Sequence, residues 1–153
     1  MTRTAAREIA IRICFAASSA KVSPEEIMEQ FFSEEHYETL KAEDELFADF
    51  PDEKQMDYIK RLTALIFENV GELDGYIERY SNDWRTERIS KTALAVLRCA
   101  LCEILYMEDI PNAAAINEAV ELDKSFDEPD VVAFVNGVLG GFMRGEQDRL
   151  AKA

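Results

Sequence analysis

The sequence predicts an all-α fold, and three observations lead to this expectation. Glycine and proline number only six and four among 153 residues, so few positions would interrupt a helix. Apolar residues recur at spacings of three and four, which is the period of helices with a buried face. Runs that alternate Val, Ile and Thr with polar residues, which would indicate strands, are missing from the sequence.

The first half of the chain contains start signals for three helices. The first helix is expected from about Thr4 to Ser19, apolar nearly all round and exposed mainly at its start. Ser23 caps the second helix, in the sequence Ser-Pro-Glu-Glu. Residues 33–55 are acidic with a few large apolar groups, which indicates a short helix or a variable connection. A long helix then runs from Asp52 until Gly71 ends it.

The second half contains the most apolar helix. Another helix is expected over roughly 73–80, and the apolar one runs from Thr86 to about Met107. Pro111 begins the next helix and Asp130 caps the last. About seven helices with short loops are typical of packed bundles, so we expect one helical domain over residues 1–153, with 33–55 as its acidic variable segment.

Net charge is −14 and is distributed unevenly along the chain. Residues 1–22 carry four basic groups and one acid, whereas residues 23–58 carry thirteen acids and two bases. A protein of this charge does not bind polyanions over its whole surface. Any contact with nucleic acid is therefore expected at the N-terminal end.

The composition argues against export and against a membrane span. No stretch approaches the roughly 20 consecutive apolar residues that a span needs, and the start lacks the apolar run of a signal peptide. Three cysteines make a poor disulfide framework. Cys99 and Cys102 lie in an apolar helix and are expected in the core. We therefore expect a cytoplasmic protein.

Residues that would indicate catalysis are scarce. His36 is the single histidine and lies in the acidic segment, so no Ser-His-Asp or Cys-His arrangement has a second candidate. Glu-x-x-His pairs for a di-metal site and phosphate-binding glycine loops are also missing. We expect no enzyme activity, no metal site and no cofactor.

An ordered series of motifs runs through the second half of the chain. AINEAVEL occupies residues 115–122, KSF follows at 124–126, and FVNGVL follows at 134–139. In this order and spacing they resemble the NusB family of transcription antitermination factors. The opening AAREIAIRICFAAS, residues 5–18, is similar to the family's first helix. The resemblance covers residues 3–20 and 56–143.

The resemblance implies a fold and a set of partners. The fold is two helical subdomains that share the long N-terminal helix. The partners are NusE, a small-subunit ribosomal protein, and the single-stranded boxA RNA of ribosomal RNA operon leaders. Together they act in the RNA polymerase antitermination complex that suppresses termination. Some family members are dimers, so a homodimer is an alternative, with an exposed patch of Tyr80, Trp84 and Phe142 as candidate partner-binding surface.

Five positions match the family's RNA contacts: Arg3, Arg7, Lys124, Asp130 and Phe134. Arginines at the positive end of a helix gain from a phosphate, and a phenylalanine ring stacks on an unpaired base. Each has a structural alternative: solvated basic side chains, a helix cap at Asp130, and a core ring at Phe134. Separately, Arg98 is expected to pair with Glu118, because a buried acid needs a partner.

The chain departs from the family at several of these positions. Its N-terminal arginine cluster is thinner, Ala133 stands where a basic residue is frequent, and Ala93 and Leu94 replace frequent charged residues. With so few basic contacts, RNA binding by the chain alone should be weak, and NusE would complete a composite surface. A second hypothesis is an adaptor that keeps its protein partners and has lost RNA recognition.

Overall fold

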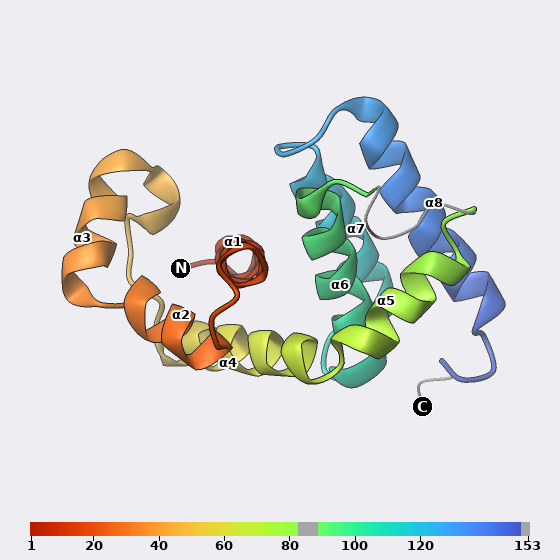
Figure 1. The fold of residues 1–153 in the computed structure, drawn as a ribbon, viewed down its shortest axis with the longest axis horizontal. Coiled ribbons are helices and arrows are strands. Elements are labelled where there is room, and N and C mark those ends of the chain that lie inside the picture. The colour runs from red at the N-terminus through yellow and green to blue at the C-terminus, as the bar shows by residue number, and fades with distance from the viewer. Residues whose placement is uncertain (83–88, 151–153) are drawn as a thin grey trace. The chain divides into compact units, whose positions relative to one another are not determined.

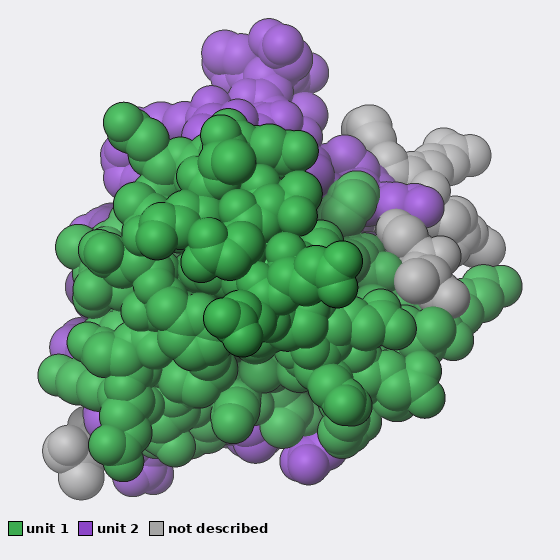
Figure 2. All heavy atoms as spheres, turned by 90° about the vertical axis from the view of Figure 1, so that its left-hand side faces the viewer, with its two compact units in different colours: residues 1–64 green, residues 65–153 purple. Residues whose placement is uncertain are grey.

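The computed structural model describes residues 1–82 and 89–150 (Figure 1). Regular structure in these ranges consists of eight α-helices and one 3-10 turn, without a strand, which confirms the all-α fold. None of these helices is long and apolar enough to cross a membrane. Contacts divide the chain into two compact units, Met1–Ala64 and Leu65–Ala153, which Figure 2 colours separately. The single domain over 1–153 remains a prediction.

The helices that begin in unit 1 start at polar caps. The elements are α1 (Arg3–Ala20), α2 (Pro24–Phe31), α3 (Glu34–Glu43), the 3-10 turn η1 (Glu45–Phe47) and α4 (Glu53–Glu68). Side chains of Thr2, Ser23, Ser33 and Asp52 each accept a hydrogen bond from the backbone N–H three residues ahead, at 2.9–3.3 Å. These bonds satisfy donors that a helix leaves unpaired at its start, and the predicted Ser23 cap is confirmed.

The acidic segment 33–55 folds around aromatic side chains. Of the two alternatives for this segment, the structure has the short helix, α3. Tyr37 and Phe47 are 4% and 1% exposed, and their rings meet edge to face with centroids 5.6 Å apart. The Tyr37 hydroxyl donates to the backbone carbonyl of Asp49 at 2.7 Å. Tyr37 and Phe47 thus provide a small core for this segment, while most of its acids remain exposed.

Unit 2 is built around its most apolar helix. Its helices are α5 (Val70–Arg79), α6 (Lys91–Tyr106), α7 (Asn112–Asp123) and α8 (Pro129–Gly145). Helix α6 contacts α5, α7 and α8, and ten of its residues are buried. Cys99 and Cys102 are among them as free thiols, which confirms their predicted place in the core.

An ion pair joins α6 to α5. Nε and Nη2 of Arg98 donate to the two carboxylate oxygens of Asp74, both at 2.8 Å. The sequence pointed to Glu118 as the partner of Arg98, and the bidentate contact goes to Asp74. Spacing along a chain does not reveal which acid a neighbouring helix presents, so this pairing depended on the packing of α5.

Two helix boundaries differ from the predicted ones. Gly71 lies inside α5, because α4 ends at Glu68 and α5 begins at Val70. Asp130 is not the cap of the last helix: Glu128 is, and Pro129 occupies the first turn. A proline at the first helical position has the φ that a helix requires, so α8 begins earlier than Asp130. The predicted start at Thr86 lies outside the described residues.

The Tyr80 ring packs against Gly141 and Gly145 of α8. The residue follows the end of α5, and its hydroxyl donates to the carboxylate of Glu146. A methyl group at Gly141 would lie 3.4 Å from Cδ1 of Tyr80, and one at Gly145 would overlap the phenol ring. The two glycines therefore allow the ring to approach α8 closely.

We expect Gly145→Ala to lower the free energy of unfolding by about 1–3 kcal/mol, because the added methyl group displaces the Tyr80 ring. Gly137→Ala is the matched control, since nothing lies within 4 Å of a methyl group there. The control should raise stability by up to about 1 kcal/mol through helix propensity. Denaturant unfolding measures both. An equal loss for Gly145→Ala in a Tyr80→Ala background would contradict the explanation.

Candidate nucleic-acid interface

Arg3 is held in place at the N-terminus of α1. Its Nε donates to Oε1 of Gln55 at 2.8 Å, and its guanidinium carbon lies 4.0 Å above the centre of the Tyr58 ring. Gln55 and Tyr58 are 7% and 1% exposed, so both supports are fixed by the core of unit 1. Arg3 itself is half-buried. A guanidinium held by one hydrogen bond and a ring face retains further donors for an anion.

Arg7 lies one turn further along the same face. Its guanidinium carbon is 5.7 Å from the centre of the Tyr58 ring, so Arg3 and Arg7, four residues apart, lie over the same ring. Its exposure is only 3%, however, so the expectation that the start of α1 presents both arginines to solvent is wrong for Arg7. Arg7 thus lies buried beside the face of the Tyr58 ring, which also receives Arg3.

The first turn of α1 favours an anion. The first turn contains no acidic side chain, and the unpaired N–H groups of a helix start already carry partial positive charge. The nearest acid along the helix, Glu8, has its pKa raised by burial, and Arg12 opposes this shift. Arg12 bridges Glu8 and Asp44 at 3.5 and 3.3 Å, so it is occupied within unit 1.

The second group of predicted residues lies at the end of α7 and the start of α8. Lys124 follows α7, is exposed, and its Nζ donates to Glu121 at 2.6 Å. Asp130 is exposed in the first turn of α8, and Phe134 follows one turn later. Residues four apart on a helix share a face, so the carboxylate and the half-buried ring belong to one surface of α8.

Two acids, the buried Asp123 and the half-buried Asp127, lie at the connection from α7 to α8. Asp123 is 0% exposed, and neither of its carboxylate oxygens has a hydrogen-bond donor among the described residues. Asp127 accepts from the Thr92 hydroxyl at 3.0 and 3.1 Å and from Ser90 at 3.3 Å. Burial and the neighbouring Asp127 carboxyl raise the pKa of Asp123 to about 8. Asp123 therefore keeps its proton at neutral pH.

The predicted apolar patch around Tyr80 is partly wrong. Phe142 is 0% exposed, because its ring lies 5.0 Å from that of Tyr76 and 6.0 Å from that of Tyr80. Tyr80 is half-buried and bonded to Glu146. Trp84 lies outside the described residues. Of the three, only Tyr80 is described with part of its side chain at the surface.

Comparison with known proteins identifies the family. The NusB family model matches residues 4–144. The chain belongs to the NusB family. The transcription antitermination protein NusB of Acetivibrio thermocellus is 37% identical over 140 residues, which cover 92% of this chain and 87% of the relative. That of Clostridium botulinum (strain Kyoto) is 38% identical over 141 residues, covering 92% and 98%.

Solved structures of NusB proteins share the fold of this NusB-family chain. The T. maritima NusB aligns with a TM-score of 0.77 and 27% identity, covering 94% of this chain and 92% of its own. A crystal structure of antitermination factors NusB and NusE in complex with dsRNA aligns with a TM-score of 0.76 and 20% identity, covering 94% and 96%. The second similarity concerns the fold alone.

The NusB-family chain functions in transcription antitermination and is not an enzyme. The described side chains include no group of three or more His, Cys, Asp or Glu residues that could hold a metal ion. Two residues of the candidate interface, Gln55 and Tyr58, were not predicted as part of it. No motif of the sequence included either residue in a site, and nothing in the sequence linked them to Arg3.

We expect Asp123→Asn to stabilise the protein at pH 8 by about 1–3 kcal/mol, the cost of a buried group without its partner. The folded state holds a proton up to about pH 8, whereas an unfolded aspartate releases it near pH 4. Wild-type stability therefore falls as the pH rises through this window and levels off above it. Asparagine removes the titration and donates a hydrogen bond to Asp127.

Thermal unfolding between pH 4 and pH 9 measures this difference, with exposed Asp57→Asn as the matched control. The control should follow the wild-type dependence on pH. A parallel dependence in wild type and Asp123→Asn would exclude a proton held between Asp123 and Asp127.

Proposed function

We propose that this chain pairs with NusE and that the pair binds boxA RNA in the leaders of ribosomal RNA operons. Within the RNA polymerase antitermination complex, in the cytoplasm, this binding suppresses termination. The solved complex of a NusB with NusE and dsRNA supports the proposal through its shared fold. The observation that carries it in this chain is Arg3, which Gln55 and Tyr58 hold at the start of a helix whose first turn contains no acidic side chain.

The geometry around Arg3 suits a phosphate. The side chain uses Nε for Gln55 and forms no other hydrogen bond among the described residues, so its two Nη groups can donate to phosphate oxygens. The first-turn N–H groups of α1 favour the same anion. Because Tyr58 already restricts the side chain, binding orders few additional degrees of freedom. Arg7 supports the site from its buried position over Tyr58.

The residues at α7 and α8 supply a different kind of contact. The exposed carboxylate of Asp130 can accept from the amino group of a cytosine, and the ring of Phe134 can stack on an unpaired base. Lys124 now neutralises Glu121 and can exchange that exposed partner for a phosphate, because surface ion pairs contribute little stability. These three residues would supply base selection, whereas Arg3 supplies affinity.

NusE contributes the remaining affinity. The whole chain carries a net charge of −14, and each neutralised phosphate of a single strand contributes only about −0.7 to the salt slope. One accessible arginine and one lysine cannot hold RNA tightly at physiological salt. Tyr80 and Trp84 are our candidates for the surface that receives a protein partner, NusE or a second copy of the chain.

A second candidate function is an adaptor that binds protein partners without RNA. The burial of Arg7, at 3% exposure, favours it, because this removes one of two N-terminal arginines from direct contact with a phosphate. The strong negative charge of residues 23–58 also favours the adaptor, because it repels the phosphates of RNA. The two candidates differ in one property, the dependence of RNA binding on Arg3.

We expect Arg3→Ala to weaken binding of a boxA RNA by the chain and NusE together by about tenfold, roughly the value of one charge-assisted hydrogen bond. The slope of log affinity against log salt should become shallower by about 0.7. Fluorescence anisotropy with labelled RNA measures both, at several salt concentrations, with and without NusE.

Lys41→Ala is the matched control, because Lys41 is an exposed basic residue on α3 of the same unit. It should change neither affinity nor slope. RNA binding that is unaffected by Arg3→Ala would reject the role of α1. The absence of RNA binding in every mixture, with NusE association intact, would assign the chain to the adaptor class.

A further inference from the structure

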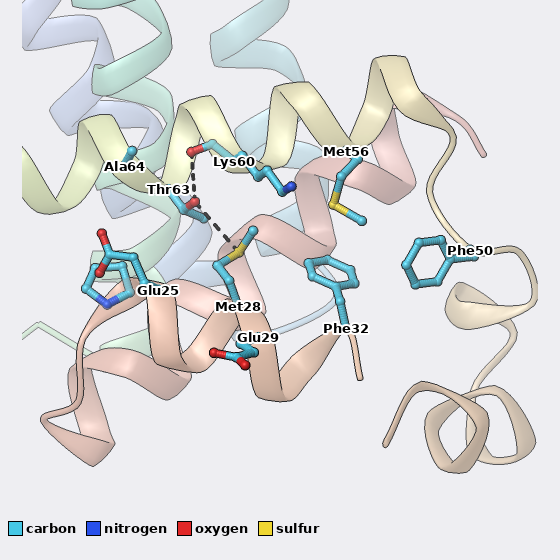
Figure 3. Close-up of a pocket in the computed structure, with 10 residues that line it drawn as sticks. Glu25, Met28, Glu29, Phe32, Phe50, Met56, Lys60, Thr63 and Ala64 are labelled. Atoms are coloured by element: carbon cyan, nitrogen blue, oxygen red, sulfur yellow. Dashed lines mark hydrogen bonds between the residues drawn. The ribbon is translucent and has the colours of Figure 1, made fainter. Parts of the chain in front are cut away.

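An open apolar groove lies between α2 and α4 of unit 1 (Figure 3). Its volume is about 730 Å³, and its lining consists of Pro24, Glu25, Met28, Glu29, Phe32, Phe50, Met56, Lys60, Thr63 and Ala64. The rings of Phe32 and Phe50 meet edge to face, 5.8 Å apart. Phe50 is 53% exposed, which is unusual for a phenylalanine. The groove therefore exposes apolar surface that the fold does not cover.

The groove uses helix faces that the core of unit 1 leaves free. On α2, Glu25, Met28 and Glu29 share one face, whereas Ile27 is the residue that α2 buries. On α4, Met56 and Lys60 line the groove. Gln55 and Tyr58 are buried on another face of α4, where they contact Arg3. Spacings of three and four place these residues in one stripe on α2 and one stripe on α4, and a third helix can dock between two such stripes.

Charge at the rim defines what fits the groove. Glu25 and Glu29 lie one turn apart on the α2 side, and Lys60 lies on the α4 side (Figure 3). The surrounding segment 23–58 has thirteen acids and two bases. This field repels phosphate and attracts basic groups. RNA is thus an unfavourable occupant, and a basic peptide is a favourable one.

We propose that this groove binds a basic amphipathic helix of a protein partner. Apolar side chains of that helix, at spacings of three and four, enter between Phe32, Phe50 and Met56. Lysine or arginine side chains beside them pair with Glu25 and Glu29. Met28 and Met56 adapt to the entering side chains, because thioether side chains are flexible and polarisable. This surface is additional to the RNA and NusE contacts proposed above.

The probe is a labelled leucine–lysine peptide of about four helical turns, with leucine at one face and lysine beside it. A matched peptide has glutamate in place of every lysine. Anisotropy titrations with the full chain should give saturable binding of the lysine peptide, weakening with salt, and no binding of the glutamate peptide. Equal binding of both peptides, or none of the lysine peptide, would overturn the proposal.

Two pairs of variants localise the contact. Phe50→Ser should weaken the lysine peptide by about tenfold, the scale of one buried aromatic side chain, whereas Phe15→Ser, at the other exposed phenylalanine, should not. Glu25→Gln with Glu29→Gln should weaken it more than Glu34→Gln with Glu38→Gln, an exposed pair on α3. Equal effects within either pair would overturn the assignment, provided circular dichroism shows each variant folded.

Further measurements separate this proposal from the others. Phe50→Ser should leave NusE association and boxA RNA binding unchanged, so failure at either interface is recognised independently. Loss of NusE association in Phe50→Ser would make the groove part of that interface and reject a separate partner. Concentration-dependent self-association that disappears in Phe50→Ser would assign the groove to a second copy of the chain, and would also reject it.

Discussion

The burial of α6 is the constraint on which unit 2 depends. An almost wholly apolar helix is stable only when other helices cover it, and α5, α7 and α8 provide that cover. Each fully buried large aliphatic residue contributes roughly 1.5–3 kcal/mol. This requirement brings Asp74 to Arg98 at the edge of α6, where a bidentate ion pair satisfies both. It also brings Thr92 beside Asp127, and thereby sets the connection from α7 to α8.

In unit 1, the Tyr58 ring contacts both N-terminal arginines, Arg3 and Arg7. Tyr58 is buried, and its face receives the guanidinium groups of Arg3 and Arg7. A restricted arginine binds a phosphate at a lower entropic cost than a solvated one. Arg7 is buried beside the same ring. The start of α1 therefore presents one ordered arginine, Arg3, and fewer cations that a phosphate could reach. The RNA binding proposed for this strongly acidic chain would therefore depend on a partner for affinity.

Helix α4 separates two surfaces by its own periodicity. Gln55 and Tyr58 face the start of α1, where the chain is basic, whereas Met56 and Lys60 face α2, where it is acidic. Positions 55 and 58 are three apart, and positions 56 and 60 are four apart, so each pair occupies its own stripe. One helix therefore supports both the proposed anion-binding site and an apolar groove of opposite charge preference.

The sequence by itself determined the all-α class, the cap at Ser23, the core cysteines and the family, because periodicity, capping residues and ordered motifs are local properties. The interface depended on tertiary structure. Burial of Arg7, the Asp74 partner of Arg98 and the burial of Phe142 each reflect which side chain a neighbouring helix presents, and chain spacing contains no such information. The same holds for Gln55 and Tyr58, whose link to Arg3 joins residues 52 positions apart. Helix α8 also begins earlier than the sequence predicted, because Pro129 occupies its first turn and Asp130 therefore lies inside the helix.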